Sequence, residues 1–532
     1  MRDEEKDPAP RPGPLRRVLG ALSGLLAGSG ALATAELASA AVRPESGPVV
    51  AVGGAAIDRT PAAVKDWAIR QFGTADKLVL QTGIVVVLAV LVAGLGVPAV
   101  RFRRAGAAGV LLFGLVGAVA ATGRPDSTGL TDALPSLLGA VAGALLLYAL
   151  AGRLQHRRDE SGPTPGTTGA FDRRGFVLTA AATAAASAAA GTAGGYLNGA
   201  SGKGAAASRA GVVLPRPGSP ARPVPARAGL RIAGISPFVT ENTDFYRVDT
   251  ALVVPKVDAS TWRLRVHGLG VRRPAVFTYD SLLRRELIER DITLTCVSNE
   301  VGGPYTGTAR WLGVRLVDLL AECGVRPPSQ GGPADQLVAR SVDGMTLGTP
   351  VEDVLDGRDA MLALGMNGEP LPFAHGFPVR MVVPGLYGYV SACKWIEDLE
   401  LTTFDAYDPY WVKRGWARRA PVKTQSRIDT PKPFARPKAG PVMVAGVAWA
   451  QHRGIDRVEV RIDDGPWQDA RLAEEAGRDT WRQWSFPWQA TKGGHTLTVR
   501  ATDRTGAVQT ARRTRTVPDG ASGRHSVVVT VE

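Results

Sequence analysis

The feature that most constrains this chain is a set of long apolar segments in its first two hundred residues. A helix needs about 20 mostly apolar residues to cross a bilayer core of about 30 Å. Four segments meet this requirement, at residues 18–42, 78–98, 105–122 and 133–152, and a weaker Ala-rich segment follows at 176–197. We predict a four-helix transmembrane region over 18–152. The segment at 176–197 predicts a fifth transmembrane or signal-anchor helix, with a flexible Ala/Gly linker as the alternative.

The basic residues around these segments alternate between dense and sparse clusters. The N-terminal tail at 1–17 is rich in arginine, the loop at 43–77 offsets its basic residues with acidic ones, and the loop at 123–132 has only Arg124. The other dense clusters are Arg101, Arg103 and Arg104, and then Arg153, Arg157, Arg158, Arg173 and Arg174. Basic loops stay on the cytoplasmic side. The alternation predicts a multi-pass protein of a bacterial inner membrane, with a cytoplasmic tail at 1–17 and an extracytoplasmic chain after about residue 200.

The start of the fifth segment resembles a bacterial twin-arginine export signal. Residues 172–178 read Asp-Arg-Arg-Gly-Phe-Val-Leu and lead into a mildly apolar run. Twin-arginine signals are addresses read by an export pathway that moves folded proteins. The resemblance implies that the following domain folds inside the cell and works outside it. Stretches rich in Pro, Gly, Ser and Arg predict a linker at 153–175 and a disordered linker at 198–229.

Charge, cysteine and histidine usage exclude several classes of function. A net charge of +14 can indicate a nucleic-acid partner, but no zinc-ligand spacing, helix-turn-helix signal or basic-aromatic stripe accompanies it, so we expect none. Three cysteines form neither a disulfide framework nor a CxxC zinc site. None of the six histidines lies in an apolar segment, which argues against membrane-bound haem. We interpret these helices as an anchor or docking platform.

After residue 230 the pattern changes to that of a folded α+β domain. Alternation at 261–266 predicts a strand, 279–290 predicts a helix, and 291–296 predicts a second strand that ends at Cys296. A Gly-rich turn follows this cysteine. A cysteine at a strand end before such a turn is presented from rigid backbone into a cleft, although a lone cysteine is more commonly a small buried apolar residue.

Several segments then occur in a specific order between about 235 and 405. They are Thr-Leu-Thr-Cys at 293–296 with Asn299, Thr-Ala-Arg-Trp-Leu-Gly-Val at 308–314, Met-Asn-Gly-Glu-Pro-Leu-Pro at 366–372, His-Gly-Phe-Pro-Val-Arg at 375–380, Val-Pro-Gly-Leu-Tyr-Gly at 383–388 and Lys-Trp at 394–395. This ordered set resembles the sulfite oxidase family of molybdopterin enzymes, and the resemblance continues to about residue 510. It implies a molybdopterin-binding oxidoreductase domain at 230–420.

The resemblance also implies a cofactor site. Cys296 matches the cysteine whose thiolate binds molybdenum beside the pterin dithiolene, and a soft thiolate suits such a metal. Guanidinium forks suit the pterin phosphate. The residues implied to hold molybdopterin are Tyr246, Arg247, Cys296, Asn299, Arg310, His375, Arg380, Ala392, Cys393 and Lys394. Taken singly, each of these side chains has an ordinary structural alternative, such as a surface strand arginine or a solvated lysine.

The other two cysteines are expected to be structural. Cys323 follows a predicted helix end and is assigned to the core, and Cys393 lies in the cofactor segment, where its backbone matters more than its sulfur. A disulfide between them is the alternative outside the cytoplasm.

Two positions next to the expected metal depart from the family pattern. Met345 stands where the family has a tyrosine, and Asp249 falls at or near an anion-binding arginine. These two residues, with Cys296, are the candidate catalytic positions. A carboxylate about 4 Å from a sulfite anion would cost about 4 kcal/mol at an effective dielectric of about 20. The departure puts sulfite as the substrate in doubt.

The last hundred residues have the pattern of an antiparallel sandwich. Residues 442–448, 458–462 and 495–503 alternate between apolar and other side chains and are separated by turn signals such as Asp-Asp-Gly at 463–465. The region at 435–532 resembles the immunoglobulin-like dimerisation domain of sulfite oxidases. A homodimer is therefore implied by the resemblance.

These features predict a membrane-anchored, extracytoplasmic molybdopterin oxidoreductase. It would transfer an oxygen atom and two electrons to or from a small oxyanion or sulfur compound. No CxxCH haem motif is present, so the electron partner is expected to be a separate molecule. The first alternative is a sulfoxide or N-oxide reductase, resembling the periplasmic methionine sulfoxide reductases, which lack the sandwich. The second is a non-catalytic, membrane-tethered binding protein with a degenerate metal domain.

Overall fold

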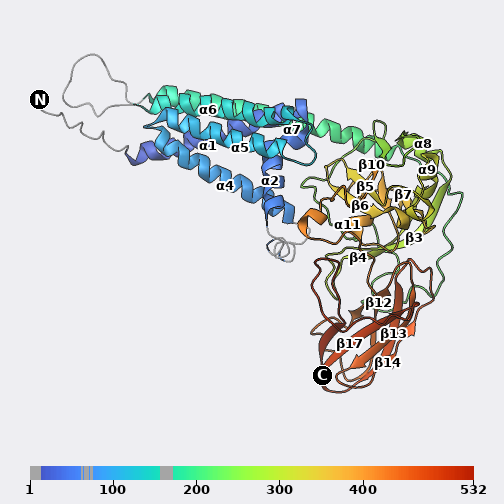
Figure 1. Cartoon of the computed structure of the whole chain (residues 1–532). Coiled ribbons are helices and arrows are strands. Elements are labelled where there is room, and N and C mark those ends of the chain that lie inside the picture. The colour runs from blue at the N-terminus through green and yellow to red at the C-terminus, as the bar shows by residue number, and fades with distance from the viewer. Residues whose placement is uncertain (1–12, 61–63, 65–70, 72–75, 156–171) are drawn as a thin grey trace, which may run out of the picture. The chain divides into compact units, whose positions relative to one another are not determined.

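The computed structural model describes residues 13–60, 64, 71, 76–155 and 172–532, and the chain divides into two compact units (Figure 1). The helical unit comprises Met1–Lys203 with Ala251–Val253, and the β-rich unit comprises Gly204–Thr250 with Val254–Glu532. Residues 1–12 of the arginine-rich tail, Arg157 and Arg158, and most of the linker predicted at 153–175 lie outside the described residues.

The helical unit contains the predicted apolar helices and one that the sequence analysis missed. Its helices are α1 (Pro14–Val42), α2 (Pro48–Arg59), α4 (Asp76–Ala99), α5 (Arg103–Thr122), α6 (Leu134–Leu154) and the first part of α7 (Arg173–Ala210). Among the described residues, five helices are long and apolar enough to cross a membrane. Helix α2 lies inside the loop predicted at 43–77. Its 12 residues are too few to cross a membrane, so the length criterion for spanning helices did not predict it.

Small residues bring the helices of this unit into close contact. A Cβ atom on Gly24 of α1 would lie 2.0 Å from the carbonyl oxygen of Val92 in α4, and one on Gly96 would lie 2.0 Å from that of Gly20. The two backbones therefore touch, as expected where glycines line a helix interface.

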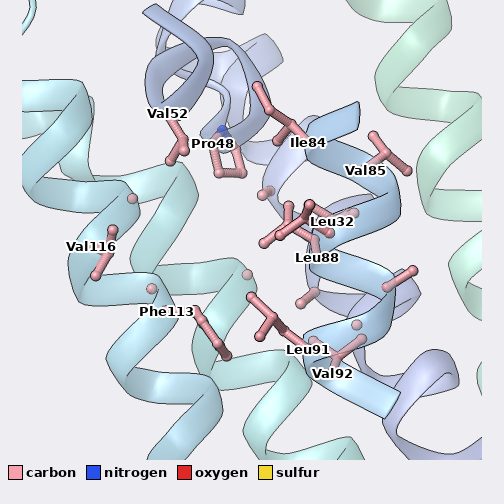
Figure 2. A pocket seen from close by; sticks show the side chains of 18 of the residues that line it. Leu32, Pro48, Val52, Ile84, Val85, Leu88, Leu91, Val92, Phe113 and Val116 are labelled. Atoms are coloured by element: carbon pink, nitrogen blue, oxygen red, sulfur yellow. The ribbon is translucent and has the colours of Figure 1, made fainter. Parts of the chain in front are cut away.

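Helices α1, α2, α4, α5 and α6 also line an open apolar cavity of about 790 Å³ (Figure 2). Figure 2 shows Leu32, Leu88 and Phe113 among the side chains that line it. None of the described lining residues is ionisable or able to ligate a metal.

The prediction of a disordered linker at 198–229 is wrong. Helix α7 continues to Ala210, because the Ala-rich stretch before it has high helix propensity. The chain then runs along the β-rich unit, where the Ser219 amide donates to Leu287 O at 3.2 Å and the Glu289 amide donates to Ser219 O at 2.9 Å. The composition suggested a linker, but these backbone contacts hold the segment in place.

The first part of the β-rich unit contains two five-stranded sheets. One has the order β2-β1-β10-β5-β6, and the other has the order β3-β4-β7-β8 with β9 paired to β7. The strands of the first sheet are β1 (Arg263–Gly268), β2 (Ala275–Thr278), β5 (Gln336–Ser341), β6 (Thr346–Pro350) and β10 (Ile396–Thr402). Those of the second are β3 (Leu287–Thr295), β4 (Thr306–Arg315), β7 (Met361–Met366), β8 (Glu369–Pro370) and β9 (Arg380–Val382).

Four short helices connect these strands, and one corrects a sequence prediction. They are α8 (Tyr279–Leu283), α9 (Leu316–Glu322), α10 (Val351–Leu355) and α11 (Gly388–Ser391). The helix predicted at 279–290 is right only for its first turn, which Thr278 and Ser281 close with a capping box. From Leu287 the chain is strand β3, because it pairs with β4 over nine residues. That long-range pairing outweighs local helical periodicity.

The C-terminal part is a sandwich of two four-stranded antiparallel sheets. The sheets have the orders β11-β12-β16-β15 and β14-β13-β17-β18. Their strands are β11 (Gln425–Thr430), β12 (Gly440–Trp449), β13 (Ile455–Ile462), β14 (Gln468–Asp469), β15 (Arg471–Leu472), β16 (Arg482–Ala490), β17 (Gly493–Asp503) and β18 (His525–Val531). Val444, Val460, Trp484 and Val499 are among the buried residues of its core. The sandwich begins earlier than the predicted boundary and forms one compact unit with the preceding sheets.

Candidate functional site

Cys296 directly follows strand β3 and stands in a tight turn. Its amide donates to Tyr305 O at 3.0 Å, and the Asn299 amide donates to Cys296 O at 3.1 Å. The Asn299 side chain closes the turn by accepting from the Tyr305 amide at 2.8 Å. Cys296 is 8% exposed and lines a cavity. The turn thus presents the sulfur from a backbone fixed on both sides.

Most of the predicted site residues line this same cavity, although they come from distant parts of the chain. Those present are Tyr246, Asp249, Cys296, Met345, His375, Arg380, Ala392 and Lys394. They come from the segment before β1, the end of β3, the turn between β5 and β6, the segment around β9, and the segment after α11. The fold therefore brings the candidate metal ligand and the candidate anion-binding groups into one cavity.

Four predicted residues are not among those that line the cavity in the described part of the chain. Arg247 is exposed, and Asn299 is used to shape the turn. The Arg310 guanidinium binds Asp291 through two hydrogen bonds of 2.8 Å. Cys393 is fully buried, and its carbonyl accepts from the Met381 amide at 2.8 Å. The contacts predicted between these four residues and the cofactor remain predictions, and the residues that line the cavity do not support them.

The three cysteines are free thiols, so the alternative of a disulfide between Cys323 and Cys393 is wrong. Cys323 is 1% exposed at the end of α9 and belongs to the core, as predicted. Burial raises the pKa of all three thiols, that of Cys296 included. In the metal-free chain Cys296 is therefore a protonated thiol, and a bound cation would be needed to stabilise its thiolate.

Arg380 is a buried guanidinium without an acidic partner. It is 5% exposed, its guanidinium lies 4.9 Å from the centroid of the Trp311 ring, and no carboxylate of the described residues pairs with it. Two of its nitrogens donate to His375 O at 3.2 Å and Ala392 O at 3.5 Å, while Nε is buried with no hydrogen-bond partner. Burial lowers the pKa of Arg380 to about 10. A desolvated cation with an unused N–H group is suited to receive an anion.

His375 is a neutral hydrogen-bonding group. Its Nε2 lies 2.8 Å from Asn242 O, which assigns the proton to Nε2 because a carbonyl can only accept. Burial and then the positive charge of Arg380 lower the pKa of His375 to about 4. His375 therefore contributes no positive charge near neutral pH.

This shift predicts a pH dependence for the stability of the cofactor-free chain. The unfolded state takes up a proton near the ordinary histidine pKa of 6.5, whereas folded His375 does so only near 4. The contribution of His375 to the free energy of unfolding is therefore fully present above about pH 6.5 and is lost as the pH drops toward 4. We expect thermal unfolding scans from pH 8 to pH 4 to show this loss, and His375→Gln to reduce it. An equally steep loss in the variant would contradict the assignment.

Asp249 and Lys394 form a buried ion pair in the cavity. Lys394 Nζ lies 2.7 Å from Asp249 Oδ2, and the two side chains are 9% and 5% exposed. The sequence analysis treated Asp249 as a free negative charge that would repel sulfite. The lysine offsets that charge, so the repulsion is weaker than the sequence estimate, and Lys394 is correspondingly less available to an anion.

The cavity also contains residues that the sequence analysis missed. They are Phe245, Val248, Thr250, Val297, Ser298, Ser341, Asp343, Gly388, Tyr389, Trp395, Trp411 and Trp416. Asp343 accepts from the Thr250 hydroxyl at 3.0 Å and from the Met345 amide at 3.3 Å. Trp416 packs against Tyr389 and Trp411, with ring centroids 5.6 and 6.2 Å apart. The high density of aromatic residues at 404–416 was the one sequence signal for the tryptophans of the cavity. Nothing in that stretch itself indicated that these residues line the cavity.

Comparison with family models gives a match over most of the site. Residues 251–411 match the family described as "Oxidoreductase molybdopterin binding domain". Among solved structures, the sulfane dehydrogenase SoxCD from Paracoccus pantotrophus aligns with a TM-score of 0.48 and 26% sequence identity, over 56% of this chain and 84% of that chain.

Comparison with curated proteins gives relatives of two kinds. Mitochondrial sulfite oxidase from Rattus norvegicus is 31% identical over 293 residues, which cover 47% of this chain and 53% of the relative. Nitrate reductase [NADH] 1 from Oryza sativa is 36% identical over 183 residues, 30% of this chain and 20% of the relative. The chain thus spans about half the length of the sulfite oxidases it matches. With the match at 251–411, these identities show that the β-rich unit contains a molybdopterin-binding oxidoreductase domain similar to that of the sulfite oxidases.

Proposed function

We propose that this chain is a membrane-anchored molybdenum enzyme that transfers an oxygen atom and two electrons to or from a small oxyanion or sulfur compound. The observation that carries the proposal is the cavity in which the thiol of Cys296 and the guanidinium of Arg380, which has no acidic partner, both lie. A soft metal ligand and a buried anion receptor are the two groups that a molybdenum-bearing, phosphate-containing pterin requires.

The residues present fit that cofactor. Cys296 would ligate the molybdenum, and the Arg380 guanidinium would bind an anionic part of the pterin. Neutral His375 and the phenol of Tyr246, whose pKa burial raises well above 10, offer further hydrogen bonds. When bound, the cofactor supplies the two-electron redox chemistry. The protein binds it, orients it and shields it from water.

The charges in the cavity bear on the substrate. The cations Arg380 and Lys394 stand against the carboxylates Asp249 and Asp343, and Trp411 and Trp416 form an aromatic side. Since Arg380 is assigned to the cofactor and Lys394 is paired with Asp249, little positive charge remains for a dianion. This balance favours a second candidate function, reduction of a neutral sulfoxide or N-oxide at the same site.

We further propose that the β-rich unit lies outside the cytoplasm, held by the helical unit. The five apolar helices, the alternating arginine clusters and the Arg-Arg pair at the start of α7 support this orientation. Val86, Val87 and Val90 of α4 each expose more than half of their surface, which suits contact with lipid. Protease added to intact spheroplasts should then digest the β-rich unit; full protection would refute the orientation.

The sandwich is proposed to be an immunoglobulin-like domain that forms a homodimer, as the family resemblance implies. Its two antiparallel sheets around a Val- and Trp-rich core support the first part of this proposal. Light scattering of the detergent-solubilised chain would test the second, since a particle containing one chain would contradict a dimer.

Metal and pterin analysis of the full-length chain, purified in detergent from membranes, tests the proposed function. We expect about one molybdenum and one pterin per chain, because the cavity offers one thiol ligand. A chain that folds but lacks both would leave the binding-protein alternative. Turnover with sulfite, compared with dimethyl sulfoxide and trimethylamine N-oxide, then separates the two candidate reactions.

A further inference from the structure

Strand β3, which ends one residue before Cys296, lies at the edge of its sheet. The sheet order β3-β4-β7-β8 leaves one side of β3 without a neighbouring strand. The backbone groups on that side need other partners, because a buried N–H or C=O group without one is destabilising. At the start of the strand, Ser219 supplies them.

At the Cys296 end of β3, the partners come from the C-terminal sandwich and the loop before β16. The Gln451 side-chain amide donates to Thr293 O at 3.1 Å and to Thr295 Oγ1 at 2.9 Å. The Trp481 amide donates to Thr293 Oγ1 at 2.7 Å, and the Thr293 amide donates to Asp479 O at 2.9 Å. Gln451 and Trp481 are 1% and 2% exposed, so water does not compete for these bonds.

These bonds converge on the strand end that carries the candidate metal ligand. Thr295 immediately precedes Cys296, and its Oγ1 also lies 3.2 Å from Thr306 Oγ1 of strand β4. Gln451 therefore holds the last residue of β3 from the side opposite to β4. Loss of that contact would free the strand end and, with it, the position of the Cys296 sulfur.

We infer that Gln451 is a positioning residue for Cys296, and that the sandwich supports the strand that carries this residue in addition to any role in dimerisation. The inference rests on the proposed function, because it assigns Cys296 to the metal. It also applies to the metal-free chain, in which the same bonds limit access to the Cys296 thiol. That second consequence can be measured without any turnover.

The test compares Gln451→Met with a matched control, Gln483→Met. Both glutamines are 1% exposed residues of the C-terminal sandwich, and methionine preserves their length. Gln483 binds the segment at 230–236, through Leu230 N at 2.5 Å and Ser236 O at 2.7 Å, and makes none of the bonds to β3. Any effect seen only in Gln451→Met therefore comes from the strand end.

The first readout is alkylation of Cys296 in the full-length chain produced without cofactor, followed by mass spectrometry, with Cys323 and Cys393 as internal references. We expect Gln451→Met to raise the Cys296 rate about tenfold, the factor expected when a buried hydrogen-bonding group loses its partner, and Gln483→Met to leave it unchanged. The second readout is molybdenum per chain, which we expect to fall only in Gln451→Met.

Equal alkylation rates at Cys296 in the native chain and both variants would overturn the inference. If Gln451→Met does not fold, Thr295→Val decides, because it removes one of the two acceptors from the same contact. A native Cys296 rate in that variant would also overturn it. A native chain that carries no molybdenum would instead refute the proposed function, and the alkylation comparison would still decide the role of Gln451.

Discussion

Replacing Cys296 with serine is expected to abolish turnover with every substrate and to leave the purified chain without tightly held molybdenum. Cys296 is the only cysteine that lines the cavity among the described residues, so no other thiol can take its place. A serine hydroxyl is a hard, weakly acidic ligand that suits this metal poorly. The measurements are metal per chain and steady-state activity of the native and Cys296→Ser chains, prepared in parallel.

The matched control for this variant is Cys323→Ser. Cys323 is 1% exposed in the core at the end of α9 and does not line the cavity. Burying a hydroxyl there is expected to cost about 1–3 kcal/mol of stability without loss of molybdenum. Retention of metal and activity in Cys296→Ser would remove the assigned ligand, and with it the proposed function.

Replacing Arg380 with methionine is expected to weaken cofactor retention about 10- to 100-fold. The estimate corresponds to the loss of hydrogen bonds to a charged group, which contribute about 1.5–3 kcal/mol. The metal-free variant, by contrast, is expected to be at least as stable as the metal-free native chain. Burial disfavours the charged form of Arg380 and no carboxylate of the described residues offsets it, so methionine removes an unfavourable buried charge.

Opposite changes in these two quantities distinguish a binding role from a structural one. The readouts are pterin and molybdenum retained during purification, and the melting temperature of the cofactor-free chain. Arg315→Met is the control, because Arg315 ends a strand of the same sheet and pairs with Asp359 at 3.0 Å outside the cavity. A metal-free Arg380→Met chain that melts far below the native one would show that Arg380 supports the fold.

Sequence reasoning was most successful where the information is local. Length and apolar composition are local properties, and all five predicted segments correspond to helices that are long and apolar enough to cross a membrane. The ordered segments around Cys296, His375, Arg380 and Lys394 likewise identified residues that share one cavity. It was least successful where a short stretch suits two structures, as at 279–290, where pairing with β4 replaced the predicted helix.

Arginines show a second limit. Arg310 and Arg380 both occur in segments that resemble the family, and sequence reasoning assigned both to the cofactor. In the fold, Asp291 on the neighbouring strand binds Arg310, whereas Arg380 is buried without an acidic partner. The function of a guanidinium depends on whether a carboxylate is within reach, and strand pairing decides that.

The sequence by itself determined the apolar helices, the similarity of the β-rich unit to sulfite oxidases and the cysteine expected to hold the metal, because each depends on short runs of residues. Only the tertiary structure decided that Lys394 neutralises Asp249, 145 residues away, and that Gln451 supports the strand before Cys296 from 158 residues away. Electrostatic and hydrogen-bond energies depend on distance in space. The number of residues between two groups in the sequence does not give that distance, which is set only when the strands pair into sheets.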